Sequence, residues 1–324
     1  MEETPYCKVL TYNVNTDMRV EMPNRATGVY DWENFRWRHR KQGVFDVIMQ
    51  SGADVICLQE LREESIMDLL AERKIMEKYF IDYGKTNGTD NAFYLATLVE
   101  KSKWQPSSKQ VLWMSETLTP TEFWSDIHGG NGFGRMVLST SYRAPAIPDP
   151  KKKSALQTMV ENNSKSLVVI NTHFGLPVGE RLCEAENIAN ICKEYLDYQA
   201  VVCGDFNSFP DARGEDQEKI ILDSKFQAAA PYCAAMETCD KEYGTILGTQ
   251  ISYPYDSWTD DQGRRHPNPG EMGGHLDHIY FSPELKIKER ASLFCCGPYG
   301  YDPTAKRPMQ PSDHLPLIAT LYKC

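Results

Sequence analysis

Short apolar runs recur along the chain, and each ends beside a polar side chain. The runs at 55–58 and 167–170 are continuously apolar, a pattern typical of strands that are covered on both faces. β-Branched and aromatic residues predict strands at 8–14, 53–60, 93–99, 136–139, 167–173, 200–203, 275–281 and 311–321. The polar residues at the ends of these strands are therefore candidates for a functional site.

Segments with apolar residues at helical spacing separate several of these strands. They predict amphipathic helices at 32–50, 62–78 and 182–195, and a further helix after Asp211 that reaches Leu222. No internal repeat is visible. The chain therefore reads as strands that alternate with helices.

The predicted helix at 32–50 carries a basic cluster formed by Arg36, Arg38, Arg40 and Lys41. Such a cluster can contact a phosphate backbone, but a charged run on a helix is usually a solvated face. We therefore interpret these four residues as facing solvent.

Length and composition describe a soluble globular protein. With 324 residues, the chain is long enough for two domains or for one large β-rich sandwich, and it contains no evident linker. No apolar run approaches the roughly 20 residues of a membrane span, so we expect no membrane insertion. The formal net charge of -10 opposes long-range attraction to a polyanion, although a local basic groove can still bind one.

The amino terminus and the cysteines bear on location. Residues 1–7 contain two glutamates and no hydrophobic core segment, so they do not resemble a secretory signal. The 10 cysteines include no C-x-x-C pair, and Cys57 and Cys203 lie in strongly apolar runs, which predicts reduced, buried thiols. We expect a cytoplasmic or nuclear protein, with a secreted, disulfide-bonded form as the alternative.

The stretch 201–210 brings Asp205 and Asn207 to a point where Gly204 and Pro210 end a strand. Residues i and i+2 of an extended segment point to the same side, so both side chains would face one target. A carboxylate supplies a hard oxygen for Mg²⁺, and an amide can donate to a phosphate oxygen. The alternative is a strand-to-turn junction without function, because these residue types are common in turns.

Other strand ends also carry chemically capable side chains. Glu60 follows a buried strand, where a carboxylate is costly unless it is paired or binds a metal, and its alternative is a charge at the start of the next helix. Asn13 and His173 end two further strands, and each has a structural alternative. Asp-His dipeptides at 277–278 and 313–314 lie at the edges of two apolar strands.

The segment between the strands at 93–99 and 136–139 is predicted to be a long loop that includes Trp113 and Trp124. Aromatic residues on a loop can stack a nucleobase, but more often they hold the loop on the core, which is the favoured interpretation. Trp124 and Arg135 are nevertheless candidates for substrate binding, since an arginine can contact a phosphate.

Six motifs occur in order, T-Y-N-V, L-Q-E, N-T-H, G-D-F-N, L-D-H-I-Y and S-D-H-L-P. Together they resemble the endonuclease/exonuclease/phosphatase superfamily, the deoxyribonuclease I-like metal-dependent phosphoesterases. The resemblance extends from Thr11 to Leu317. It implies an α/β (α+β) fold, a four-layer sandwich of two packed mixed β-sheets flanked by helices. It also implies that residues 1–324 form a single catalytic domain.

The resemblance implies a Mg²⁺ site at which Mn²⁺ can substitute. Glu60 resembles the family's principal metal ligand, and Asn13 and Asp313 resemble residues close to the metal. A divalent ion neutralises charge on the phosphate and stabilises the leaving oxygen. Whether one or two ions bind is open.

The resemblance also implies the catalytic groups. Asp205 and Asn207 resemble the pair that orients the nucleophile and the phosphate, and His173 resembles the phosphate-contacting histidine. His314 resembles a histidine held by a buried carboxylate, here Asp277, a pairing that fixes the imidazole tautomer and raises its basicity. Asp205 and His314 are both candidates for the group that takes the proton from water.

The motifs around Asp205 and His314 are most similar to those of deadenylase-like exonucleases and related phosphodiesterases. We therefore expect a Mg²⁺-dependent hydrolase that cleaves a phosphodiester in a nucleic acid, either RNA or single-stranded DNA. One alternative is a sphingomyelinase-like enzyme that acts on a phospholipid or a small phosphorylated molecule. Another is a module that binds a phosphorylated ligand without turnover. The residues identify no protein partner.

Overall fold

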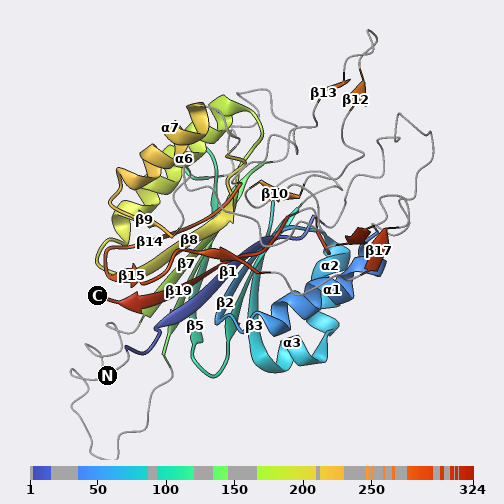
Figure 1. Cartoon of the computed structure of the whole chain (residues 1–324). Coiled ribbons are helices and arrows are strands. Elements are labelled where there is room, and N and C mark those ends of the chain that lie inside the picture. The colour runs from blue at the N-terminus through green and yellow to red at the C-terminus, as the bar shows by residue number, and fades with distance from the viewer. Residues whose placement is uncertain are drawn as a thin grey trace, which may run out of the picture.

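Two mixed β-sheets pack face to face in this protein, and helices cover the outer face of each sheet (Figure 1). This arrangement confirms the predicted four-layer α/β sandwich. The computed structural model describes residues 3–15, 36–86, 93–119, 134–144, 166–208, 212–229, 246–247, 250–251, 258–259, 265–266, 276–294, 300–302, 307–309, 311–312 and 314–324.

The first sheet has the strand order β15-β19-β1-β2-β4-β3, with β16 paired to β19. Its strands are β1 (Cys7–Asn13), β2 (Val55–Leu61), β3 (Tyr79–Lys85), β4 (Tyr94–Glu100), β15 (Leu285–Ile287), β16 (Ser292–Leu293) and β19 (Leu317–Lys323). The second sheet has the order β5-β6-β7-β8-β14-β9. Its strands are β5 (Gln105–Trp113), β6 (Met136–Arg143), β7 (Ser166–His173), β8 (Gln199–Asp205), β9 (Gln227–Ala228) and β14 (Asp277–Phe281).

Short strands and helices complete the described elements. The strands form three hairpin-like pairs, β10 (Ile246–Leu247) with β11 (Gln250–Ile251), β12 (Trp258–Thr259) with β13 (Arg265–His266), and β17 (Gly300–Asp302) with β18 (Arg307–Met309). The first sheet packs on α1 (Trp37–Gln50), α2 (Glu63–Ala71) and α3 (Arg73–Lys78). The second sheet packs on α6 (Val178–Glu194) and α7 (Ala212–Leu222).

Successive residues of a central strand supply two different cores. In β2, Val55 and Cys57 lie in the core between the sheets, whereas Ile56 and Leu58 pack under α1 to α3. Side chains of a strand alternate between its faces, so a strand covered on both faces reads as a continuous apolar run. The continuous runs in the sequence therefore correspond to the central strands.

Each sheet contains one parallel pair of neighbouring strands, and both pairs direct their carboxyl ends to the same end of the sandwich. The carboxyl ends of these inner strands form the shared edge of the two sheets. β1 and β2 form the pair in the first sheet, and Asn13 lies opposite Gln59. β7 and β8 form the pair in the second sheet, and His173 lies opposite Asp205. Antiparallel β14 places Asp277 on the other side of Asp205. Topology thus gathers the predicted polar residues at one edge.

Gly204 is required by the close approach of β7 and β8. A Cβ atom at this position would lie 2.1 Å from the backbone oxygen of Thr172. No side chain can occupy that space, so the glycine before Asp205 has a packing role as well as its place in the motif.

Some predicted elements differ from the structure. The helix predicted at 62–78 is two helices, α2 and α3, because Glu72 has an extended conformation and its side chain accepts a hydrogen bond from Lys74 N. The predicted loop after residue 100 contains the nine-residue strand β5, and Trp113 is its last residue. β5 has no apolar run because its first six residues are exposed, which hid it from the hydrophobic pattern.

Cys57 and Cys203 are free and buried, as predicted. Among the described residues, no helix is long and apolar enough to span a lipid bilayer. The cytoplasmic or nuclear location stays a prediction, as does the single domain of residues 1–324.

A buried polar contact joins the sheets beneath their shared edge. β2 contains one extra residue relative to β4 between Leu58 and Leu61, which is a β-bulge. Asn171, from the second sheet, donates to the carbonyl oxygens of Leu58 at 3.2 Å and Ala96 at 2.9 Å, and it accepts from Gln59 at 2.9 Å. Its amide therefore satisfies backbone groups at the bulge of the opposite sheet.

Replacing Asn171 with alanine should destabilise the protein, because it removes a side-chain donor from two buried carbonyl groups and an acceptor from Gln59. We expect the free energy of unfolding to fall by about 1–3 kcal/mol, measured by urea denaturation. The matched control is Asn190→Ala, at an exposed position of α6, which should change stability by less than about 0.5 kcal/mol. Equal effects of the two substitutions would contradict this role.

Candidate active site

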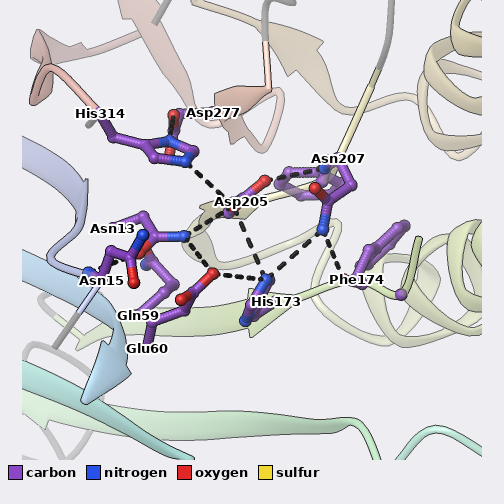
Figure 2. A network of polar contacts seen from close by, with 12 residues as sticks. Asn13, Asn15, Gln59, Glu60, His173, Phe174, Asp205, Asn207, Asp277 and His314 are labelled. Carbon is purple, nitrogen blue, oxygen red and sulfur yellow. Dashed lines mark hydrogen bonds and ion pairs between the residues drawn. The ribbon is translucent and has the colours of Figure 1, made fainter. Parts of the chain in front are cut away.

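Side chains from both sheets meet at the shared edge (Figure 2). Asn13 and Glu60 come from β1 and β2, and His173 and Asp205 from β7 and β8. The remaining members are Asn207, which follows β8, Asp277 at the start of β14, and His314, which precedes β19. The structure therefore brings together the described members of the predicted set.

The amide of Asn13 connects the two sheets. Its Nδ2 donates to Glu60 Oε1 at 2.9 Å and to Asp205 Oδ2 at 2.8 Å, while its Oδ1 accepts from Asn15 N at 2.9 Å. In this arrangement Asn13 positions two carboxylates. Direct coordination of a metal by Asn13 stays a prediction.

The bulge in β2 directs Glu60 into this site. By strict alternation Glu60 would share the helix-covered face of Leu58, but the extra residue shifts the phase, so that Leu61 lies on that face. Glu60 has a φ of 54°, in the left-handed region that costs about 1 kcal/mol or more for a residue with a Cβ. Its side chain turns toward Asn13 as a result.

A tight turn joins Asp205 to Asn207. β8 ends at Asp205, whose Oδ1 accepts from Asn207 N at 2.8 Å, and Asn207 has a φ of 47°. Asn207 Nδ2 donates to Phe174 O at 2.8 Å. The two side chains thus meet through a turn that Asp205 closes, and not through an extended segment as the sequence pattern suggested.

His314 is held by Asp277. Its Nδ1 lies 2.8 Å from Asp277 Oδ2, and its Nε2 lies 3.8 Å from Asp205 Oδ2. Both side chains of the pair are almost fully buried. The carboxylate thus fixes the orientation of the imidazole, and Nε2 is the nitrogen that faces the site.

His173 lies between the site and a buried arginine. Its Nε2 is 3.6 Å from both Glu60 Oε1 and Asp205 Oδ2, and its Nδ1 is 3.2 Å from Arg135 Nη1. Burial lowers the pKa of His173 well below its usual range, and the positive charge of Arg135 and the nearby His314 lower it further. The imidazole is therefore neutral near pH 7.

Burial raises the pKa of Asp205 to about 7. The neighbouring Asp277 also raises this pKa, whereas His314 and the hydrogen bonds from Asn207 and Asn13 lower it. Desolvation disfavours the charged carboxylate, and the like charge of Asp277 adds to that cost.

The donor set fits a divalent cation. Ligand atoms of Glu60, His173 and Asp205 lie within 4.8 Å of one another, as do those of Asp205, Asp277 and His314. Hard carboxylate oxygens are the ligands that Mg²⁺ prefers in proteins. Amide groups of Asn13 and Asn207 donate to Asp205, and Asp277 adds a like charge nearby, so a cation would supply positive charge that balances the carboxylates.

The prediction that Arg40 faces solvent is wrong. Arg40 is fully buried, and its guanidinium donates to the backbone oxygens of Val14 at 3.0 Å, Asn15 at 2.6 Å and Pro311. It therefore ties the segment after β1 to the segment before His314. Arg40 lies at helical spacing from the buried Trp37 and Val44, and this signal could have revealed it.

Asp313 and Trp124 lie outside the described residues, so their predicted roles stay predictions. Arg135 is buried, and its guanidinium faces His173 and Glu180. Direct contact between Arg135 and substrate also stays a prediction.

A sequence profile described as Endonuclease/Exonuclease/phosphatase family matches residues 10–314. The chain belongs to this family. Members of this family are hydrolases that act on phosphoester bonds, and they generally depend on divalent metal ions. The predicted family is thereby confirmed.

Known relatives are distant. Carbon catabolite repressor protein 4 homolog 1 from Arabidopsis thaliana is 22% identical over 389 residues, covering 98% of this chain and 57% of that protein. The chain thus spans less than two thirds of this relative. A mannosyl-6-phosphatase from Bacteroides thetaiotaomicron gives a TM-score of 0.64 at 18% identity, covering 97% and 99% of the two chains.

A second structural neighbour is TDP2 from D. rerio, complexed with a single-strand DNA product. It gives a TM-score of 0.57 at 12% identity, covering 98% of this chain and 99% of that one. At such identities the likeness to both structures shows the fold alone.

Because the pKa of Asp205 is raised, the free energy of unfolding of the metal-free protein should depend on pH. The pKa is near 3.8 in the unfolded chain and about 7 in the folded one, so stability is lost as pH rises through 7 and the buried group ionises. Asp205→Asn should therefore stabilise the protein by about 2 kcal/mol more at pH 8 than at pH 5.

Thermal unfolding in the presence of a chelator measures this difference. Asp197→Asn is the matched control, because Asp197 is exposed, and its effect should be the same at both pH values. A pH-independent effect of Asp205→Asn would contradict the raised pKa.

Proposed function

We propose that this protein is a Mg²⁺-dependent phosphodiesterase that cleaves RNA or single-stranded DNA, with Mn²⁺ as a substitute metal. The observation that carries the proposal is that one amide holds the carboxylates of Glu60 and Asp205 together, with the imidazole of His173 3.6 Å from each. Carboxylates are rarely held so close in a buried place unless a cation or a shared proton offsets their charge. In this proposal residues 1–324 act as a single catalytic domain.

Glu60 would be the principal ligand of the metal, and Asn13 would set the distance between the carboxylates of Glu60 and Asp205. The side chain of Glu60 is 21% exposed, whereas that of Asp205 is 2% exposed, so Glu60 forms the accessible side of the site. A bound divalent cation would neutralise the non-bridging oxygens of the phosphate and stabilise the leaving oxygen.

Two neutral donors would orient the phosphate. Asn207 is anchored by Phe174 O, and its turn is closed by Asp205, so its amide is held in one position. His173 presents Nε2 to the same space. Donors that are already in place stabilise negative charge without a reorganisation cost.

The water proton has two candidate acceptors. Nε2 of His314 and Oδ2 of Asp205 lie 3.8 Å apart, and a carboxylate orients His314 from behind. A water molecule bound near both would be aligned by one group and deprotonated by the other. Asp205 and His314 both remain candidates for the general base.

A small phosphorylated molecule or a phospholipid headgroup is the second candidate substrate. The likeness to a mannosyl-6-phosphatase favours it, and the net charge of -10 does not favour a long polyanion. The neighbour bound to single-strand DNA favours the nucleic acid. We place the nucleic acid first because the motifs around Asp205 and His314 are most similar to those of deadenylase-like exonucleases.

Removal of the Glu60 charge should abolish most activity. We expect Glu60→Gln to lower kcat on bis-p-nitrophenyl phosphate with Mg²⁺ by about 10²-fold or more, because the side chain keeps its shape but loses the charge that binds the metal. Glu63→Gln, at an exposed position three residues later, is the matched control and should retain activity. Equal rates for wild type and Glu60→Gln would overturn the proposal.

One substrate screen decides between the two candidates. Poly(A) RNA, single-stranded DNA, abasic duplex, a phosphoinositide, sphingomyelin and mannose 6-phosphate would each be incubated with Mg²⁺ and protein. We expect cleavage of RNA or single-stranded DNA. Turnover of the lipids or the sugar phosphate alone would reject the nucleic-acid substrate. A Mg²⁺-dependent rise in Tm without any product would indicate a binding module.

A further inference from the structure

A buried charged cluster lies behind His173, on the side away from the metal-binding carboxylates. Arg135, immediately before β6, places Nη1 3.2 Å from His173 Nδ1 and Nε 4.0 Å from Glu180 Oε1. The exposed fraction is 6% for the side chain of Arg135 and 1% for that of Glu180. A buried charge pair often stabilises a fold no better than apolar residues of the same volume would, so this pair is a candidate for a role other than stability.

A hydrogen bond between Arg135 and His173 can form in only one direction. A guanidinium can only donate and stays protonated, so Nδ1 of His173 must accept from Arg135. A neutral imidazole has one acceptor and one donor nitrogen, which puts its proton on Nε2. Nε2 is the nitrogen that faces Glu60 and Asp205.

One contact competes with this arrangement. Asn207 Nδ2 lies 3.4 Å from His173 Nε2, and a hydrogen bond from Asn207 would require Nε2 to accept. That distance is longer than the 2.8 Å hydrogen bond that Asn207 Nδ2 gives to Phe174 O. Arg135 is a charged donor and lies closer to the ring, at 3.2 Å from Nδ1. Its hydrogen bond to Nδ1 is therefore stronger than the one that Asn207 could give to Nε2.

The first turns of α6 hold the arginine in place. Glu180 packs on Gly175, where a Cβ atom would lie 1.9 Å from the carboxylate carbon, so this position accepts only glycine without rearrangement. Glu184, one turn later, accepts from Gly175 N at 2.8 Å. Burial, then the charge of Glu180, raises the pKa of Glu184 well above its usual range, and Arg135 opposes this shift. Glu180 thus lies beside the guanidinium of Arg135, and Glu184 anchors the backbone of Gly175, on which Glu180 packs.

We propose that Arg135 is a positioning residue that holds the proton of neutral His173 on Nε2, seated by Glu180 of α6. In this state His173 donates a hydrogen bond to a phosphate oxygen, and it neither coordinates the metal nor accepts a proton. This role in turnover rests on the proposed function, whereas the tautomer itself does not. It also replaces the predicted contact between Arg135 and substrate with an action through His173.

The tautomer can be read directly from ¹⁵N-labelled histidine. In metal-free wild-type protein at neutral pH, two-bond ¹H–¹⁵N spectra should show His173 with a protonated Nε2 and an unprotonated Nδ1. His173→Gln assigns the signals. Arg135→Met should move the ¹⁵N chemical shifts of His173 toward the average of the two tautomers. Arg135→Lys keeps a charged donor, so its shifts should lie closer to those of wild type.

Matched variants separate positioning from general damage to the fold. Arg143→Met removes an exposed arginine at the other end of β6, and it should leave the His173 signals unchanged. Glu180→Gln keeps Arg135 but removes the charge that seats it, so the signals should move in the same direction as in Arg135→Met. If Arg135→Met does not fold, wild type and Glu180→Gln still decide the question.

Kinetics then test the role in turnover. Arg135→Met should lower kcat by about tenfold to a hundredfold with little change in KM, since the donor is needed mainly where charge develops on the phosphate. In a His173→Gln background, Arg135→Met should lower kcat by less than about a further twofold, because the two substitutions remove the same function.

Two spectroscopic results would overturn the proposal. One is a proton on Nδ1 of His173 in wild type, and the other is a spectrum that Arg135→Met leaves unchanged. Full additivity of the two substitutions in kcat would reject the role in turnover. Absence of phosphoester hydrolysis by wild type would reject the proposed function, and the spectrum would still decide on Arg135.

Discussion

A single side-chain amide holds two carboxylates from different sheets next to each other. Asn13 donates to Glu60 in its own sheet and to Asp205 in the other. Like charges repel strongly in a buried site, so the pair persists only with donors between the groups and with a cation or a proton to balance the charge. Neither sheet alone carries both carboxylates, and the site therefore depends on the face-to-face packing of the sandwich.

Polar side chains that support this edge are as deeply buried as the hydrophobic core. Asn171 bonds to the bulge of the opposite sheet, and Arg40 ties together the segments on either side of the site. A buried polar group that loses its hydrogen-bond partner destabilises the fold more than an apolar group in the same place would. Each of these contacts therefore favours one arrangement of the sheets and the adjoining segments over all others. The supports thereby limit how far the carboxylates and imidazoles can move.

The described groups at the edge are carried by strands and short turns. Groups on strand ends are held in place by the sheets, whereas the segments that connect strands can differ between proteins of one fold. One fold can therefore act on different substrates. The structural neighbours accord with this division, since they include a mannosyl-6-phosphatase and a protein bound to single-strand DNA.

The sequence by itself determined the central strands and the face on which several site residues lie. Asp205, for example, is two residues from the inward-facing core residue Cys203, and alternation is a local property of any strand. Only the tertiary structure decided where Glu60, Arg40 and Arg135 point. A bulge turns Glu60 into the site, and distant carbonyl groups and an imidazole bury the two arginines. These outcomes depend on partners far away in the sequence, and among them only the burial of Arg40 leaves a local signal, its helical spacing from Trp37 and Val44.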